Sequence, residues 1–177
     1  MAVWALAVDS LTKSPIVILK EVGGEKTLPI WIGILEAISI ASELQGVKFL
    51  RPTTHDLLKN ILGLIDAKVN NVEICDLKNN TYYALINIAI NGEGITIDAR
   101  PSDALALSLR MNAPIFVLEQ VINKSKQIDL EVEPEDKSEQ GKKWQEILEK
   151  MDPKDFGNTW RKLVFSHRPK VANLTLR

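Results

Sequence analysis

The segment that decides the fold is RPSDALALSLRM, residues 100–111. From about Ser102 to Met111 it is apolar on almost all of its faces, and a helix of this kind is stable only where other parts of the chain bury it. Asn112 and Pro114 end the helix, because proline lacks the backbone N–H that a helix needs. The segment therefore predicts a buried helix.

Short β-forming runs lie on both sides of this helix. Residues 115–118 follow it as one strand, and residues 69–75 and 82–90 precede it as two longer strands. The Asn-Gly pair at 91–92 is typical of a tight hairpin turn, and it leads into a third strand at 95–97. The second half of the domain is therefore expected to run strand–strand–strand–helix–strand.

The first third of the chain predicts three more strands and two helices. The strands correspond to residues 4–8, 15–19 and 27–32, which are short apolar runs separated by turn residues. Apolar residues then recur at helical spacing in residues 33–46 and again after Pro52. The predicted order is βββ-αα-βββ-α-β, an α+β (mixed α/β) fold in which three helices pack on one mixed, largely antiparallel sheet.

Composition divides the chain into a domain and a C-terminal extension. Residues 1–125 contain all of the predicted strands and these three helices, so we expect them to fold as one domain. Residues 126–143 are charged and poor in apolar side chains, which is typical of a linker. Residues 144–157 have apolar positions at i, i+3, i+4 and i+7 and predict an amphipathic helix. Residues 158–177 form a basic tail that we expect to be mobile.

The bulk composition excludes several classes of protein. Of the 177 residues, 45% are hydrophobic, so we expect a packed core. The formal net charge is −1, so we expect no general attraction to nucleic acid or to an anionic membrane. Cys75 is the single cysteine, which excludes an intramolecular disulfide and a thiolate metal cluster. Signal-peptide, membrane-spanning and nucleotide-cofactor motifs are absent from the sequence. We therefore expect a cytoplasmic protein that has no organic cofactor and does not bind a membrane.

Two segments combine an arginine, a proline, a hydroxyl group and an acidic residue ahead of an apolar helix. They are RPTTHDLL, residues 51–58, and RPSDAL, residues 100–105. Each places a guanidinium beside a helix N-terminus, where unpaired backbone N–H groups favour anions, and arginine binds phosphate through two parallel hydrogen bonds. We therefore expect Arg51, Arg100 and Ser102 to form one phosphate-binding cleft.

The acidic residues of these segments also have a purely structural explanation. Thr53 and Asp56 have the spacing of a capping box, and a helix dipole alone favours Asp103 in a first turn. Capping does not need the two arginines, although either one can form a structural ion pair with a neighbouring carboxylate. Both interpretations of Asp56 and Asp103 stay open at the level of the sequence.

His55 and Glu36 extend the set of candidate catalytic groups. A histidine changes its protonation state near neutral pH, so His55 is a candidate acid or base, although a lone histidine at a helix start is more often structural. Glu36 follows the strand at 27–32 and either faces solvent or points a carboxylate into the cleft. Mg²⁺ and Mn²⁺ prefer oxygen ligands. The carboxylates that such an ion would use are Glu36, Asp56, Asp98 and Asp103.

The same motifs resemble those of the bifunctional nuclease domain, a family of bacteria and plants that was long catalogued as a domain of unknown function. The likeness rests on LPIWIG at 28–33 with Glu36, on the two Arg-Pro segments and on API at 113–115, and it covers about residues 1–125. Residues 144–157 are similar to the extension of many bacterial members, whereas the basic tail departs from the family pattern.

The resemblance implies a mixed α/β fold, a homodimer and a nuclease activity on both RNA and DNA. The positions that match the family's polar motif residues are Glu36, Arg51, His55, Asp56, Arg100, Ser102 and Asp103.

Two hypotheses about function follow from these residues. In the first, the protein is a phosphodiester hydrolase of RNA or single-stranded DNA in which Arg51, Arg100 and Ser102 bind the scissile phosphate. A Mg²⁺ or Mn²⁺ ion activates water in this hypothesis. The catalytic candidates are His55, Asp56, Asp103 and Glu36, of which the three carboxylates are the candidate metal ligands. In the second hypothesis, a non-catalytic dimeric binding or regulatory module uses the same cleft to bind an anion.

Overall fold

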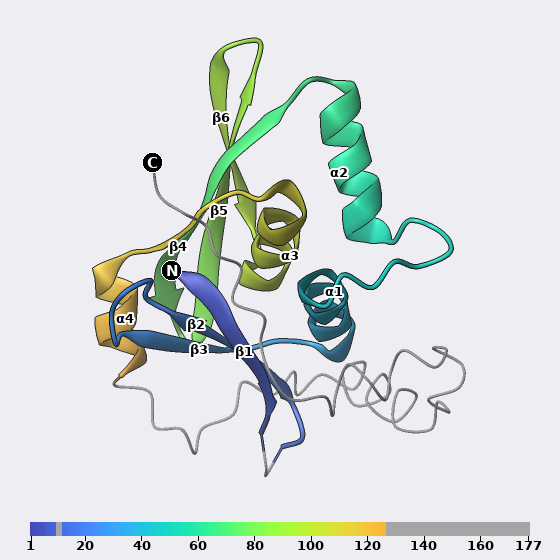
Figure 1. Cartoon of the computed structure of the whole chain (residues 1–177). Helices are drawn as coiled ribbons and strands as arrows, with labels where there is room; N and C mark the ends of the chain where they lie inside the picture. Colours follow the sequence, from blue (N-terminus) through green and yellow to red (C-terminus); the bar gives the residue numbers. More distant parts are fainter. Residues whose placement is uncertain (10–11, 127–177) are drawn as a thin grey trace.

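The computed structural model describes residues 1–9 and 12–126, which form two sheets and four helices (Figure 1). The elements are β1 (Ala2–Val8), β2 (Pro15–Lys20), β3 (Thr27–Trp31), α1 (Ile34–Leu44), α2 (Thr54–Leu64), β4 (Lys68–Lys78), β5 (Thr81–Ile90), β6 (Glu93–Ala99), α3 (Pro101–Met111), β7 (Ile115–Val117) and α4 (Glu119–Ser125). The α+β class is confirmed, and so is the predicted order of strands and helices as far as β7.

The strands form two sheets, where the sequence predicted one. β1, β2 and β3 pair in order as an antiparallel sheet, whereas the second sheet has the strand order β6-β5-β4-β7. β7 joins it parallel to β4, with Ile115 opposite Val72, after the chain crosses over through α3. Short turns link the first three strands, which pair among themselves. Strand patterns alone do not reveal this separation, because they identify strands but not long-range partners.

α4 was not expected from the sequence. It has seven residues, too few for a helical period to stand out from the surrounding pattern. Val121 and Ile122 of this helix are buried, and it packs against β4 and β3. α4 therefore contacts one strand of each sheet.

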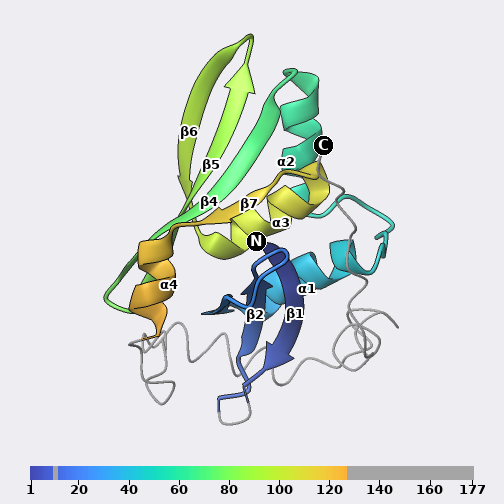
Figure 2. The same ribbon diagram turned by 60° about the vertical axis from the view of Figure 1, so that its left-hand side comes forward.

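α3 is buried, as its composition predicted, and it packs against α1, α2, β4 and β5 (Figure 2). Residues 104–107 are at most 1% exposed. Pro101 occupies the first turn, where its fixed φ suits a helix. Asn112 ends the helix in the left-handed conformation with a φ of 52°. The start of α3 therefore has a well-defined position relative to both neighbouring helices and the second sheet.

Two tight turns connect the long strands of the second sheet. Asn91 and Gly92 have φ values of 52° and 85°, which confirms the predicted hairpin between β5 and β6. Asn79 and Asn80 have φ values of 48° and 57° in the turn between β4 and β5. Asparagine and glycine adopt this left-handed region at low cost, so both turns are encoded locally.

α2 lies at the edge of the domain. Leu62 is its one buried residue, and the helix packs against α3. We call the exposed apolar side chains on and just after this helix the α2 face, and they are Leu57, Leu58, Ile61, Leu64 and Ile65.

Among residues 1–9 and 12–126, no helix has both the length and the apolar character that a membrane crossing requires. Apart from Lys126, the predicted linker at 126–143 lies outside the described residues. The predicted helix at 144–157 and the basic tail at 158–177 also lie outside them.

A chain truncated after Lys126 should unfold in a single cooperative thermal transition, like the full chain. The physical reason is that the contiguous core cluster begins at Val17 and ends at Val121, and a closed core of this kind supports cooperative unfolding. Scanning calorimetry of both chains measures this. An insoluble truncated chain, or one that melts without cooperativity, would show that later residues complete the core.

Candidate functional site

The first turns of the three long helices carry the polar residues that the sequence predicted. Glu36 lies in the first turn of α1, Asp56 in that of α2 and Asp103 in that of α3. The positive end of a helix dipole favours carboxylates at these positions. Arg100 is the N-cap residue of α3.

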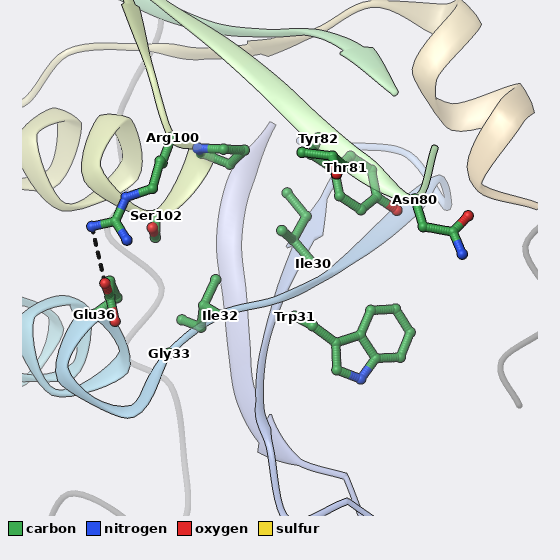
Figure 3. A pocket seen from close by; sticks show the side chains of 11 residues that line it. Ile30, Trp31, Ile32, Gly33, Glu36, Asn80, Thr81, Tyr82, Arg100 and Ser102 are labelled. Carbon is green, nitrogen blue, oxygen red and sulfur yellow. Dashed lines mark ion pairs between the residues drawn. The ribbon is translucent and has the colours of Figure 1, made fainter. Parts of the chain in front are cut away.

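Arg100 joins the start of α3 to the start of α1. Its Nε lies 2.8 Å from Asp103 Oδ2 and its Nη2 lies 3.2 Å from Asp103 Oδ1, a two-pronged pair. The same Nη2 lies 3.0 Å from Glu36 Oε1, as the dashed line in Figure 3 shows. The Arg100 side chain is still 67% exposed. Solvent therefore screens these ion pairs on the arginine side, which limits their contribution to stability.

His55 connects α2 to the other two helices. Its Nδ1 lies 2.9 Å from Ser39 Oγ in α1, and its Nε2 lies 3.2 Å from Asp103 Oδ1 in α3. An ionised carboxylate only accepts hydrogen bonds, so the arrangement requires a proton on Nε2 that is donated to Asp103. Nδ1 then accepts from the Ser39 hydroxyl in the neutral ring and donates to Ser39 Oγ in the charged ring.

Asp103 binds side chains and does not cap its helix. Arg100 and His55 are the partners of its carboxylate, and the N-cap position of α3 has no side-chain cap. Burial alone would raise the pKa of Asp103, but the hydrogen bonds and positive charge of Arg100, with a further hydrogen bond from His55, outweigh burial and lower the pKa. Asp103 is therefore ionised at neutral pH.

Arg110 is a buried charge beneath this group, and sequence reasoning missed it. It is 3% exposed, and its Nε donates to Asp56 Oδ1 over 2.7 Å. Its Nη1 donates to the carbonyl oxygens of Ser39 at 3.1 Å and Ala106 at 3.0 Å. A buried arginine needs such compensation, because removing it from water costs several kcal/mol. The available signal was a single arginine in an otherwise apolar buried helix.

Asp56 has the structural role that its capping-box spacing predicted. Oδ1 of Asp56 accepts the hydrogen bond from Arg110. Oδ2 accepts two more, from the backbone N–H of Thr53 at 2.9 Å and from the Thr53 hydroxyl at 2.8 Å. Burial alone would raise the pKa of Asp56, but the bonds from Arg110 and Thr53 outweigh it and lower the pKa from 3.8 to about 2. Asp56 therefore holds Arg110 and starts α2 at the same time.

The structure does not bring Arg51 and Asp98 into this group. Arg51 is exposed ahead of α2 and makes no hydrogen bond or ion pair with another described residue. Asp98 lies on the exposed strand β6. Ser39 was visible in the sequence as a neighbour of Glu36 on one helix face, but its contact with His55 joins residues far apart in the chain. We call the connected set the polar network, and its members are Glu36, Ser39, His55, Asp56, Arg100, Asp103 and Arg110.

A pocket of about 260 Å³ opens beside the polar network (Figure 3). Glu36, Arg100 and Ser102 line one end of it, and Trp31 and Asn80 lie toward the other end. The histidine and the two aspartates of the network are not part of its lining. Arg100 and Glu36 are therefore the members of the network that a molecule in the pocket would touch.

The carboxylates do not form the shared ligand set that Mg²⁺ or Mn²⁺ would need. Glu36 and Asp103 are both bound to Arg100, and Asp56 is bound to Arg110. Within the part of the chain that the structure describes, no group of three or more His, Cys, Asp and Glu side chains is arranged to hold an ion. The divalent ion expected from the sequence stays a prediction.

Comparison with known proteins gives a consistent family match. A family model described as the bifunctional nuclease domain matches residues 17–129. This range includes every member of the polar network and all of the residues that line the pocket.

The curated relatives differ in how much of their length the chain covers. An uncharacterized protein of Mycobacterium tuberculosis is 35% identical over 159 residues, which are 87% of this chain and 95% of that protein. Bifunctional nuclease 1 of Oryza sativa subsp. japonica is 30% identical over 112 residues, or 62% of this chain and 34% of the rice protein. Bifunctional nuclease 2 of Arabidopsis thaliana is 26% identical over 107 residues, which are 59% of this chain and 32% of the Arabidopsis protein. The chain spans about a third of each plant protein.

Asp56→Asn should destabilise the protein more at neutral pH than in acid. The folded-state pKa of about 2 lies below the ordinary value of 3.8, so the charged carboxylate stabilises the fold above about pH 4, and this contribution is lost as the pH falls toward 2. We expect a difference in the free energy of unfolding of about 2 kcal/mol at pH 7. Urea unfolding of wild type and variant between pH 7 and pH 2.5 measures it.

Asp98→Asn is the matched control, because Asp98 lies on the exposed strand β6. Its effect should stay within about 0.5 kcal/mol at every pH. A difference for Asp56→Asn that is the same at pH 7 and pH 2.5 would contradict the ion pair with Arg110.

Proposed function

The chain belongs to the bifunctional nuclease domain family, and from this premise we propose that it is a phosphodiester hydrolase that acts on RNA or single-stranded DNA. The plant relatives are named bifunctional nucleases, and the family model covers the residues that form the polar network and the pocket.

The observation that carries the proposal is the position of Arg100 at the wall of a pocket and at the N-terminus of α3. A guanidinium and a helix N-terminus both favour a phosphate group. Ser102, one residue into the same helix turn, adds a hydroxyl to the pocket lining. In the proposed mechanism Arg100 and Ser102 bind the scissile phosphate, and Arg100 stabilises the negative charge that develops on it.

His55 and Asp103 are the proposed acid–base groups, and they lie behind Arg100, outside the pocket lining. Asp103 accepts the hydrogen bond from His55 Nε2 and is itself held by Arg100. An ionised carboxylate in this position orients an imidazole ring and stabilises its charged form. We assign to His55 the exchange of a proton during cleavage at Nδ1, the ring nitrogen that contacts the Ser39 hydroxyl, because Nε2 is bound to Asp103.

Glu36 is proposed to position or deprotonate the attacking water, because it is the carboxylate in the described lining of the pocket. Its side chain is 19% exposed. Asp56 is bound to Arg110 and Thr53, so its contribution to catalysis is to keep α2, and with it His55, in place. Arg51 remains a candidate for a contact to the strand outside the pocket. If a divalent ion binds, it would activate water, but no step here depends on it.

A non-catalytic anion-binding module is the second candidate. The observation in its favour is that Arg100 is already paired with two carboxylates, Glu36 and Asp103. A phosphate must therefore share Arg100 with these carboxylates or displace them. An exposed arginine exchanges partners readily, but the exchange lowers the affinity for the phosphate. The same pocket would then recognise an anion without cleaving it.

We also propose that the protein is a homodimer, and that the α2 face is its contact surface. Its side chains are between 38% and 84% exposed, and contiguous apolar surface of this kind marks interaction sites. α2 also carries His55 and Asp56 in its first turn, so a partner subunit on this helix would support the polar network.

Arg100→Gln and Asp103→Asn should each lower the cleavage rate about a hundredfold, on the order of 3 kcal/mol of barrier. The first removes the group that stabilises the phosphate, and the second removes the charge that holds His55. The melting temperature should change little, because the Arg100 side chain is 67% exposed and Asn can still accept a hydrogen bond at position 103. Labelled single-stranded RNA and DNA are incubated with full-length protein in Mg²⁺, Mn²⁺ or chelator.

Lys68→Gln is the charge-matched control, since Lys68 is exposed at the start of β4, and it should keep full activity. Arg51→Gln reports whether the exposed arginine also contacts the strand. Equal cleavage by wild type, Arg100→Gln and Asp103→Asn, on protein free of contaminating nuclease, would remove the hydrolase proposal. Loss of all activity in chelator would support the predicted divalent ion.

The solution mass of the protein should be twice the 19.8 kDa of one chain. The double substitution Leu57→Lys with Ile61→Lys should convert the dimer to a monomer, because charges in an apolar contact are not compensated. Light scattering after gel filtration measures the mass. Lys59→Ala on the same helix is the control and should remain dimeric. A wild-type monomer at micromolar concentration would reject this contact.

A further inference from the structure

The pocket beside Arg100 has two chemically different ends. The end at Arg100, Glu36 and Ser102 is charged and polar, and it belongs to the proposed hydrolase site. The aromatic residues Trp31 and Tyr82 lie toward the other end, with Ile30 and Ile32 between the two ends (Figure 3). The phosphate chemistry of the first end does not explain an aromatic wall at the second.

Trp31 is held in place as part of that wall. It ends β3, where it pairs with Ile16 of β2. Its indole Nε1 donates a hydrogen bond to Asp9 Oδ2 at 3.3 Å, and the side chain is neither fully buried nor fully exposed. Trp31 lines the pocket, and an indole ring that is anchored at its edge is suited to stack on another flat ring.

Tyr82 fixes the back of the pocket. Its hydroxyl donates to the carbonyl oxygen of Pro29 at 3.1 Å and so links the second sheet to the first. Burial raises the pKa of Tyr82 to about 12, so the hydroxyl keeps its proton at neutral pH. The ring therefore contributes a rigid apolar surface, and its polar end is already satisfied.

Ser102 is a buried polar group with its hydroxyl unused. The residue is 6% exposed and lines the pocket, yet its hydroxyl makes no hydrogen bond with any residue in the described ranges. Nη1 of Arg100 also lacks a hydrogen-bond partner there. Within the described ranges no side-chain nitrogen or oxygen atom is both buried and unpartnered, so both of these groups are accessible and can donate to the acceptor oxygens of a ligand.

Asn80 adds a polar group that can recognise the edge of a ring. It lies in the turn between β4 and β5 with a φ of 57°, is exposed and lines the pocket. Its amide has no hydrogen bond within the described part of the chain. An asparagine amide both donates and accepts, which is the pattern that the edge of a nucleobase presents.

We propose that the pocket binds one unpaired nucleotide of a single-stranded nucleic acid. Its phosphate is bound by Arg100 and Ser102, its base stacks on Trp31, and the edge of the base faces Asn80. This inference rests on the proposed function, and it adds that the substrate must offer an unstacked base. A pocket of about 260 Å³ is at the small end for ligand sites, which favours a single unpaired base.

The test compares two fluorescein-labelled probes with equal numbers of phosphates, tetrauridylate and an abasic tetramer. Binding to the full chain is followed by anisotropy at low salt, and probe integrity is checked by electrophoresis. Trp31→Leu should weaken the binding of tetrauridylate about tenfold, as expected for loss of one stacked base, and should change the binding of the abasic tetramer less than twofold. Trp31→Phe should restore binding to within about threefold.

Two further variants separate base contacts from folding effects. Trp4→Leu is the matched control, because Trp4 lies on β1 of the same sheet and is not part of the pocket lining, and it should change neither affinity. Asn80→Gly removes the amide while glycine keeps the left-handed turn. It should weaken the binding of tetrauridylate about threefold and leave the abasic tetramer unchanged, even if Trp31→Leu fails to fold.

The outcomes distinguish this inference from the proposed function. If Trp31→Leu or Asn80→Gly changes the affinity for both probes equally, or for neither, the proposed base site is wrong. In that case, loss of both affinities in Arg100→Gln would still support the phosphate site. If Arg100→Gln binds both probes like wild type, the phosphate site and the proposed function fail. If uridine monophosphate competes as well as unlabelled tetrauridylate, the ligand is a free nucleotide and the strand is rejected.

Discussion

The buried charge of Arg110 is the constraint on which the arrangement of the helices depends. Its guanidinium is satisfied by a carboxylate from α2, by a carbonyl oxygen from α1 and by a carbonyl oxygen of α3 itself. Each of the three helices therefore supplies part of the compensation. Breaking a buried pair by removing one partner costs roughly 3–5 kcal/mol, so these three bonds hold the helices in one relative position.

That position sets the geometry of the groups nearer the surface. Arg110 binds the backbone of Ser39, whose hydroxyl meets His55, and His55 meets Asp103 beside Arg100. The polar network contains two arginines and three carboxylates, so a neutral His55 leaves it with one excess negative charge.

The pocket exists because two separate sheets meet. Its aromatic wall combines Trp31 from the first sheet with Tyr82 from the second, and the hydrogen bond from Tyr82 to Pro29 holds the two sheets together there. At another point, the N-terminal amino group donates to the carbonyl oxygen of Ile115 in β7. A single continuous sheet would have placed these residues along one surface and left no recess between them.

The sequence by itself determined the features that depend on neighbours in the chain. The order of elements, the buried character of α3, the capping box at Thr53 and the Asn91-Gly92 turn all follow from local periodicity and backbone preference. The grouping of Glu36, His55, Arg100 and Asp103 was expected from their place at helix starts. Only the tertiary structure decided the division into two sheets, the role of Arg110 and the exclusion of Arg51 from the group. The physical reason is that hydrogen bonds between residues some 16 to 71 positions apart depend on how whole elements pack, and no local pattern records that packing.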